Sequence, residues 1–383
     1  MAATTQATSC RALEDEATLS KSHVARAATE LIGSFILFLG IYAICSVGTF
    51  FNSTMIGANI LTFGAAIGLL YAALTYVFGK VSGAHLNPAV SLASALLGRI
   101  GIGDFFVYVI MQCAGAIGAA ELLTHLLPVS DASSSYQITL FQWIHNAING
   151  ADAASPATYS LNQIGAAGLN FGIKIGALVE VAMTIVVVAV ALRAQNDNGV
   201  PRRTAWLATG IAYAAGTAVA FPFTGAALNP ARATGMAVAG QSAVQAYNDT
   251  LPTTASSTSS SASQVTIPLP LTQLWVFWVA PLLAAAVVAL VMLVARMLRA
   301  DDESQKAATA KVSTKAAAQA PLNSSTIAAS DDATDGAAHA ETLSEAGVSY
   351  SVDDETEDET SDDSADSDDS NDSASDDAED SAK

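Results

Sequence analysis

The sequence predicts an all-α membrane protein with six transmembrane helices and two re-entrant half-helices in an inverted repeat. Three observations predict this class. Of the 383 residues, 51% are hydrophobic and only 13% are charged, which is too apolar for a soluble domain of this length. The apolar residues gather in long runs. A short motif built around Asn-Pro-Ala occurs twice, each time between two apolar runs.

The apolar runs define the spans. A helix of about 20 apolar residues is needed to cross a hydrocarbon core about 30 Å thick. Six segments meet this requirement, at residues 27–47, 59–78, 104–123, 175–193, 205–223 and 274–298. The first is expected to remain as a span, because a polar segment of 26 residues precedes it and its apolar stretch is too long for the core of a cleavable signal.

The spans divide the chain into parts. We expect a cytoplasmic N-terminal segment (1–26), a first repeat (27–124), a long outer loop (125–174), a second repeat (175–300) with a Ser/Thr-rich outer insertion near 241–272, and an acidic tail (301–383). Residues 1–300 hold 12 Lys and Arg against 11 Asp and Glu, whereas the tail holds 4 against 24. The net charge of −19 therefore belongs to the tail, which is expected to be disordered.

Basic residues predict the orientation, because short cytoplasmic loops carry an excess of Lys and Arg. One side of the predicted bundle carries Arg11, Lys21, Arg26, Lys80, Arg99, Arg193, Arg202, Arg203, Arg296 and Arg299. The loops on the other side carry only Lys174. Both termini are therefore expected in the cytoplasm, with the plasma membrane favoured over an internal one. On the outer side, Asn52 and Asn248 begin glycosylation sequons.

The motif reads SGAHLNPAV at residues 82–90 and TGAALNPAR at residues 224–232, a separation of 142 residues. Each copy lies between the second and third spans of its own half. Because three spans are an odd number, the second half enters the membrane inverted relative to the first, an arrangement found in many transport proteins.

Each motif copy also predicts a helix start. Asn is a strong helix N-cap and Pro is favoured at the first helical position, so Asn87-Pro88-Ala89 and Asn229-Pro230-Ala231 should each open a helix. The stretches 88–97 and 230–239 have about ten residues each, or roughly half the membrane depth. The inverted repeat should bring both positive helix ends to the midplane, where the two asparagines face a pore.

These motifs resemble the major intrinsic protein family, the aquaporins, over about residues 25–300, together with Glu30, Glu180 and Gln112. The resemblance implies one pore per subunit and a homotetramer. It implies that the motif asparagines donate hydrogen bonds to a passing water and so interrupt proton relay. It also implies that Glu30 and Glu180 hold the re-entrant loops; a proton relay is the alternative, but the spans contain no chain of acids.

The family has an outer selectivity filter at four positions. Counting from the motif asparagines assigns them to Ile67, Thr217, Ala226 and Arg232. Arg232 matches the family and should donate to the solute and repel cations. The other three depart from strict water channels, where an aromatic residue and a histidine narrow the filter, so a wider opening is expected. The positions that mark the glycerol-conducting branch are nevertheless of the water type, at Ala233, Ala237, Phe277 and Trp278.

We therefore expect a channel for facilitated, proton-excluding diffusion of water. The wider filter adds the hypothesis that small neutral solutes such as ammonia, urea, hydrogen peroxide or glycerol also pass. The alternatives are a glycerol, urea or ammonia facilitator with water secondary, and a closed-pore junction or scaffold protein. Ion-coupled transport would need more charge at the pore centre. No enzyme, cofactor, metal or nucleic acid is expected, because no nucleophile with a base, metal-ligand spacing or phosphate loop is present.

Two features raise regulatory alternatives. His85, beside the first motif, is expected to be a hydrogen-bonded residue of the inner vestibule; a pH gate is the alternative, because histidine titrates near neutral pH. Ser364, Ser367 and Ser370 stand among acidic residues, a context that acidophilic kinases prefer. The tail is thus either a solvated acidic segment or a site for a kinase or a cytoplasmic partner.

Overall fold

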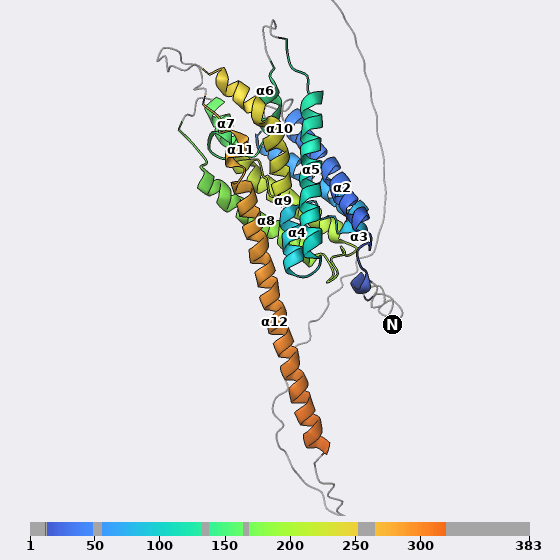
Figure 1. Ribbon diagram of the computed structural model, residues 1–383. Coiled ribbons are helices and arrows are strands. Elements are labelled where there is room, and N and C mark those ends of the chain that lie inside the picture. The colour runs from blue at the N-terminus through green and yellow to red at the C-terminus, as the bar shows by residue number, and fades with distance from the viewer. Residues whose placement is uncertain are drawn as a thin grey trace, which may run out of the picture. The chain divides into compact units, whose positions relative to one another are not determined.

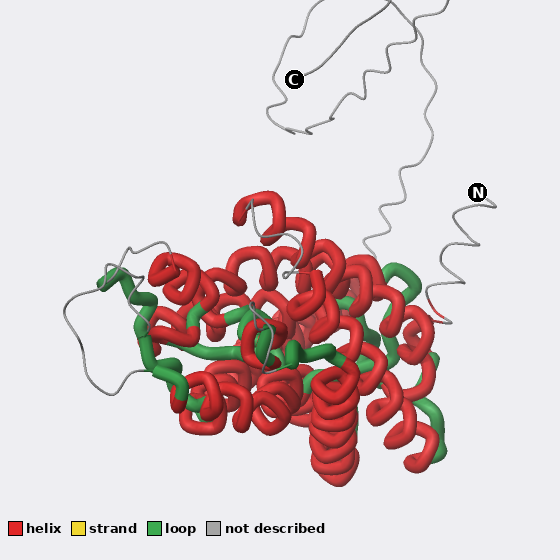
Figure 2. The backbone as a smooth tube through the Cα atoms, turned by 90° about the horizontal axis from the view of Figure 1, so that it is seen from above, coloured by secondary structure: helices red, strands yellow, loops and turns green. Residues whose placement is uncertain are grey.

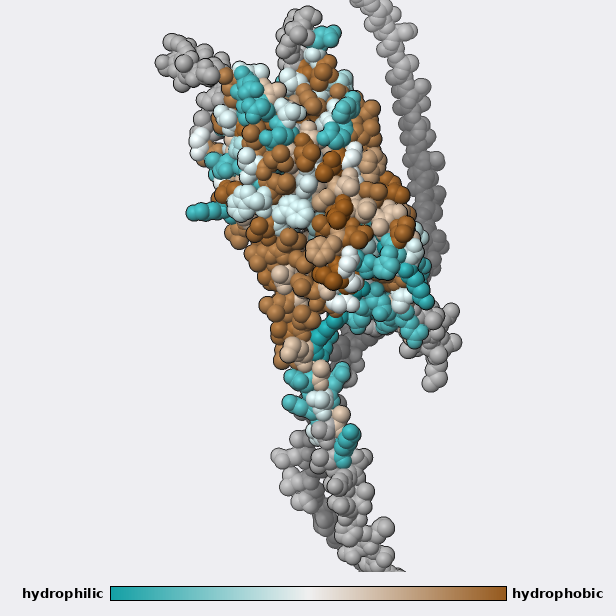
Figure 3. All heavy atoms as spheres, in the orientation of Figure 1, coloured by the Kyte–Doolittle hydropathy of each residue, from teal (hydrophilic) through white to brown (hydrophobic). Residues whose placement is uncertain are grey.

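The computed structural model describes residues 12, 14–48, 56–131, 138–163, 168–251 and 265–318. Regular structure in these segments is helical, apart from one isolated bridge between Gln195 and Pro201. Six of the helices are long and apolar enough to cross a membrane. Hydrophobic residues cover most of the visible flank of the bundle (Figure 3). The predicted all-α membrane class is confirmed.

The long helices follow the predicted spans closely. They are α2 (His23–Ala43), which continues as a π-helical turn η1 (Ile44–Gly48), α3 (Ile56–Ser82), α5 (Ile102–Leu126), α8 (Ile173–Arg193), α9 (Ala205–Thr224) and α12 (Val276–Ala318). The two re-entrant helices are α4 (Pro88–Leu96) and α10 (Pro230–Asp249). Short elements lie in the segments that connect the longer helices, at α6 (Leu140–Ile144), η2 (Asp152–Ala154), α7 (Pro156–Gln163) and α11 (Pro270–Gln273). Seen from above, loop segments pass between the helices (Figure 2).

Helices α3 and α9 cross at very close range. A Cβ atom at Gly68 would overlap the carbonyl oxygen of Gly210, and a Cβ atom at Gly210 would lie 2.8 Å from the carbonyl oxygen of Gly68. Small residues allow two helices in a membrane to approach with their backbones in contact. The crossing therefore presses the inner faces of α3 and α9 against each other.

The two re-entrant helices differ in length. Helix α4 ends after Leu96, close to Gly98, which takes the left-handed conformation (φ 72°) that stops a helix. The predicted counterpart, 230–239, is only the first half of α10, which continues to Asp249. Residues 240–249 contain no proline, so nothing ends the helix there. Helix α10 is thus about 30 Å long, and residues 241–249 of the predicted outer insertion are helical.

Helix α12 continues into the predicted tail. It runs to Ala318 and projects past the rest of the bundle in Figure 1. Residues 301–318 are rich in Ala, Lys and other helix-forming residues, and no proline follows until Pro321. The prediction that disorder begins at residue 301 is therefore wrong for this segment. Asn52 and the three tail serines, Ser364, Ser367 and Ser370, lie outside the described residues.

Candidate pore

Two irregular loops lead into α4 and α10 and share one backbone conformation. Ala84 and Leu86 have φ values of 47°, and the equivalent Ala226 and Leu228 have 52° and 50°. Residues other than glycine rarely adopt positive φ, and each instance costs about 1–3 kcal/mol. Such a conformation persists only where the surrounding contacts enforce it, so other groups must hold these two loops in place.

A buried carboxylate holds the first loop. Glu30 Oε1 accepts hydrogen bonds from Ser82 Oγ (2.6 Å) and from the backbone N–H of His85 (3.1 Å). Glu30 Oε2 accepts from the backbone N–H of Leu86 (2.8 Å) and from Gln112 Nε2 (2.7 Å). Both oxygens of this side chain, which has no exposed surface, are thus engaged by the loop and by α5.

The second loop is held in the same way. Glu180 Oε1 accepts from Thr224 Oγ1 (2.6 Å) and from the backbone N–H of Ala227 (2.8 Å), and Oε2 accepts from the backbone N–H of Leu228 (2.7 Å). Glu180 also has no exposed surface. The partners of the two carboxylates fall at equivalent positions of the repeat. This geometry favours the scaffold role for both residues over a proton relay.

The half-helices begin at the motif asparagines. Asn87 Oδ1 accepts from the backbone N–H of Ala89 (2.8 Å), and Asn229 Oδ1 accepts from that of Ala231 (3.0 Å). In each copy the motif proline is the first residue of the helix. Both positive helix ends therefore point at the segment in which the two loops meet.

Each asparagine also binds the opposite loop. Asn87 Nδ2 donates to the carbonyl oxygen of Leu228 (2.9 Å), and Asn229 Nδ2 donates to that of Leu86 (2.7 Å). The strained leucines thus supply the acceptors that join the two loops. The side-chain amides of the two halves are brought together at the centre of the bundle, in a fully buried position.

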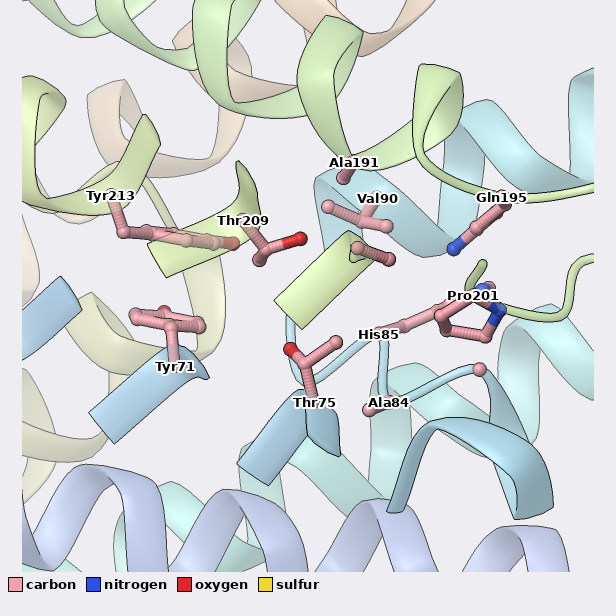
Figure 4. Close-up of a pocket in the computed structure, with 12 residues that line it drawn as sticks. Tyr71, Thr75, Ala84, His85, Val90, Ala191, Gln195, Pro201, Thr209 and Tyr213 are labelled. Carbon is pink, nitrogen blue, oxygen red and sulfur yellow. The ribbon is translucent and has the colours of Figure 1, made fainter. Parts of the chain in front are cut away.

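A tyrosine hydroxyl accepts the remaining amide hydrogen of each asparagine. Asn87 Nδ2 donates to Tyr213 Oη (2.9 Å), and Asn229 Nδ2 donates to Tyr71 Oη (2.9 Å). The two rings lie one over the other (Figure 4), with their centroids 3.3 Å apart and 3° between their planes. We call Tyr71 and Tyr213 the tyrosine pair. Its hydroxyls occupy the donors that were expected to face a passing solute.

The tyrosine pair was not among the predicted site residues. A signal was present, because each tyrosine lies 16 residues before the motif asparagine of its own repeat, from 71 to 87 and from 213 to 229. Hydropathy does not reveal it, since a tyrosine fits an apolar span. Only superposition of the two repeats shows that both copies carry the same aromatic residue at this depth.

Three of the predicted filter residues lie on the outer side of the tyrosine pair. Ile67 precedes Tyr71 by four residues on α3, and Thr217 follows Tyr213 by four on α9, which corresponds to about 6 Å along each helix. Ala226 lies in the second re-entrant loop. These residues and Arg232 are each only 2% exposed, and we call the four the outer ring.

Arg232 is held by its own loop. Its Nη1 donates to the carbonyl oxygens of Gly225 (2.6 Å) and Ala226, and its Nη2 lies 3.7 Å from Cys45 Sγ. Its buried Nε has no hydrogen-bond partner, and no carboxylate pairs with it among the described residues. A fixed positive charge with a spare donor therefore stands in the outer ring.

A small cavity lies on the inner side of the tyrosine pair. It measures about 10 Å³, room for about one water molecule. Thr75 and Thr209, each one turn inward from a tyrosine, line it together with His85 and Gln195, and Figure 4 shows the tyrosine rings at one end of it. The tyrosine pair thus separates this cavity from the outer ring.

His85 is buried beside this cavity, with 3% of its surface exposed. Its Nδ1 lies 3.1 Å from Ser91 Oγ, and its Nε2 has no partner among the described residues. Burial, assisted by the positive charges of Arg99 and Arg26, lowers the pKa of His85 to about 3. The imidazole is therefore neutral at physiological pH, which favours the hydrogen-bonded loop role over a pH gate.

The remaining predicted positions lie around this centre. Ala233, Ala237 and Phe277 are buried, and Phe277 packs with Ala227 and Ala233 beside the second loop. Trp278 Nε1 donates to Thr234 Oγ1 (3.0 Å). These side chains therefore pack around the second re-entrant loop and the helix that follows it. At the outer side, the amide of Asn248 donates to and accepts from the backbone of Ile267 (2.8 and 2.9 Å), so a glycan there would have to displace this contact.

Comparisons with known sequences show the family of this chain. The family model described as Major intrinsic protein matches residues 17–292. Aquaporin Z of Bradyrhizobium diazoefficiens is 32% identical over 262 residues, covering 68% of this chain and 88% of that protein. Aquaporin Z of Rhodopseudomonas palustris is 32% identical over 256 residues, covering 66% and 86%. The X-ray structure of the aquaglyceroporin from Plasmodium falciparum covers 70% of this chain and 94% of that chain, at 17% identity and a TM-score of 0.43. The chain therefore belongs to the major intrinsic protein family and is a transmembrane channel of the aquaporin type, not an enzyme.

Proposed function

We propose that this channel conducts water between Asn87 and Asn229 by facilitated diffusion and excludes protons. The observation that carries the proposal is that each buried side-chain amide, at the N-terminus of its half-helix, donates to the backbone of the opposite re-entrant loop. A water whose oxygen accepts from both amides turns its hydrogens away from its neighbours in the file. It then cannot pass a proton along, and the two positive helix ends oppose a cation.

Arg232 supports the same function. It forms no ion pair with a carboxylate among the described residues, and a charged side chain at membrane depth is found almost only where it faces a pore or the bundle interior. It therefore adds a second barrier to cations on the outer side. Its spare Nε–H is a donor for the oxygen of water or of a small neutral solute.

Proteoliposomes provide the test. Stopped-flow light scattering under an osmotic gradient measures water permeability, and a pH-sensitive dye trapped in the same vesicles measures proton flux. The expected result is faster shrinkage than empty vesicles and proton flux equal to theirs. The proposed function is rejected if neither the wild type nor the double variant Tyr71→Val/Tyr213→Val, which lacks both tyrosine side chains, has a water permeability above that of the lipid alone.

A second candidate is a pore that stays closed, with a junction or scaffold role. The stacked tyrosine pair favours it, because carbon atoms are in van der Waals contact at about 3.5–4.0 Å and the ring centroids are only 3.3 Å apart. This candidate predicts that wild-type vesicles shrink no faster than lipid and that the protein clusters vesicles, which turbidity reports. A wild type that conducts water contradicts it.

We further propose a homotetramer in the plasma membrane with both termini in the cytoplasm. The arginines of the predicted cytoplasmic side support the orientation, because Arg99, Arg193, Arg202 and Arg296 line one groove between the end of α8, the start of α9 and the middle of α12. The acidic tail would serve a kinase or a cytoplasmic partner. Deleting residues 320–383 should therefore leave unit permeability unchanged and alter delivery to the membrane, whereas a loss of permeability in reconstituted protein would contradict this division of roles.

A further inference from the structure

We propose that the tyrosine pair is the selective step of this pore: Tyr71 and Tyr213 together exclude every solute larger than water, although the outer ring carries no aromatic side chain. The inference rests on the proposed function and names a specificity determinant for it. Three observations carry it, which are the depth of the pair, the contact between the rings and the partners of the hydroxyls.

The first observation is position. The pair stands between the outer ring and the inner cavity on both lining helices, so any path along the facing sides of α3 and α9 meets it. The outer ring contains isoleucine, threonine, alanine and arginine, and so no aromatic side chain. Its opening is therefore less restricted than the midplane, where two aromatic rings oppose each other.

The second observation is the geometry of the stack. Aromatic pairs prefer offset or edge-to-face arrangements with centroids about 4.5–7 Å apart, whereas these rings are face to face at 3.3 Å. Attraction between the rings therefore does not explain their position. The close crossing of α3 and α9 at Gly68 and Gly210 brings the helices together, and the asparagine hydrogen bonds fix the hydroxyl ends of the rings.

The third observation is that the hydroxyls imitate the permeant. Each tyrosine oxygen accepts from the same amide that a passing water would use, at 2.9 Å. When a water replaces a hydroxyl, one neutral hydrogen bond is exchanged for another of the same kind, so water can displace the pair at little cost. A solute with carbon atoms can make the same hydrogen bond only after the rings have moved further apart.

The surroundings limit how far the rings can move. The inner cavity has room for about one water, and Tyr71 and Tyr213 are 3% and 2% exposed. A ring cannot leave the midplane without displacing its packed neighbours. The pair therefore parts far enough for a single file of water and no further, which makes water the only permeant of the wild type.

Two double variants separate the rings from the hydroxyls. Tyr71→Val/Tyr213→Val removes both rings, and Tyr71→Phe/Tyr213→Phe keeps the rings but removes the hydroxyls. The matched control is Tyr76→Val, which lies five residues after Tyr71 on α3 and is 74% exposed. Each protein is checked for a single oligomeric peak by size-exclusion chromatography and is then reconstituted for measurements of water, urea and glycerol permeability.

The valine variant is expected to raise water permeability at least tenfold and to admit urea and glycerol, with the control equal to the wild type. The phenylalanine variant should still exclude urea and glycerol, because its rings remain. Wild-type flux of urea or glycerol overturns the inference and leaves the channel function standing. Equal water and solute permeability in a conducting wild type and in the valine variant also overturns it. Lipid-level permeability in both overturns the proposed function and the inference together.

Discussion

The two repeats agree in the parts that hold the pore and differ in the parts that line and extend it. Glu30 and Glu180 bind equivalent groups, and the loops share their positive φ values. By contrast, position three after the motif asparagine is Val90 in the first half and Arg232 in the second. Helix α4 is also much shorter than α10. The two repeats therefore share the groups that hold the re-entrant loops but differ in the residues that follow the motif, and only the second repeat places a charged residue, Arg232, at this position.

The largest effect is expected when either of the two loop-holding carboxylates, Glu30 or Glu180, is removed. Glu30→Ala leaves three loop donors buried without an acceptor, and Glu180→Ala leaves two, because Thr224 Oγ1 can still donate to the carbonyl oxygen of Ala220. Each such donor costs about 1–3 kcal/mol. Both variants should fail to yield a monodisperse, folded protein in fluorescence-detected chromatography. Glu121→Ala, whose side chain is 45% exposed, is the control. A wild-type melting curve for either buried variant would show that the loops hold without their carboxylates.

The difference between Val90 and Arg232 is tested by making the second repeat like the first. In the Tyr71→Val/Tyr213→Val background, Arg232→Val should raise cation leakage about tenfold or more. A barrier of about 1.4 kcal/mol corresponds to a factor of ten, and a fixed charge in a pore supplies at least that much. Potassium flux in proteoliposomes is the measurement. Arg232→Lys keeps the charge and should stay tight to cations, and a tight Arg232→Val variant would deny the arginine this role.

A smaller effect is expected where the half-helices end differently. Gly98 has φ 72°, and a Cβ there would meet open space, so Gly98→Ala costs only the left-handed strain of about 1–2 kcal/mol. The melting temperature should fall by a few degrees. Gly103→Ala is the matched control, because its Cβ also meets open space but lies in α5, where alanine is favoured over glycine. The two changes should therefore shift the melting temperature in opposite directions.

The smallest effect concerns His85, which has Ala227 at the equivalent position of the second repeat. Because burial lowers the pKa of His85 to about 3, its charge does not change between pH 5 and 8, and water permeability of the valine background should be flat over that range with or without His85→Ala. The unfolded chain takes up the proton more readily, so the folded state loses stability as the pH falls below about 6.5. A permeability step near neutral pH that His85→Ala removes would instead establish a pH gate.

The sequence was sufficient for the features that depend on composition and repetition. The spans follow from apolar length, the motif predicted the caps at Asn87 and Asn229, and the family resemblance implied the loop carboxylates Glu30 and Glu180. The second half of α10 and the part of α12 beyond residue 300 were not predicted, for a physical reason in each case. Repeat symmetry gives no information on where α10 ends, and acidic composition concealed the helix-forming residues between 301 and 318.

The tyrosine pair shows what one-dimensional patterns leave out. A motif search assigns the amide donors of Asn87 and Asn229 but not the groups that accept from them. Those acceptors depend on which faces of α3 and α9 meet, and that is fixed by the glycine crossing at Gly68 and Gly210. The filter count assigned the outer ring by analogy with the family, whereas the stacked tyrosine pair lies one turn further in along α3 and α9.

The exchange of hydrogen bonds between the loops has a consequence for biosynthesis. The carbonyl oxygen of Leu86 accepts from the Asn229 amide, and the side-chain amide of Asn87 donates to Leu228 and Tyr213. These partners belong to the second half of the chain, which is translated later. A nascent chain with its first three spans inserted therefore carries a strained loop whose amide and carbonyl groups await partners inside the membrane. Water or assembly factors must satisfy these groups until the second half arrives. The re-entrant loops of the channel are thus completed only when its second half is inserted, and a first half alone leaves these amide and carbonyl groups without their native partners.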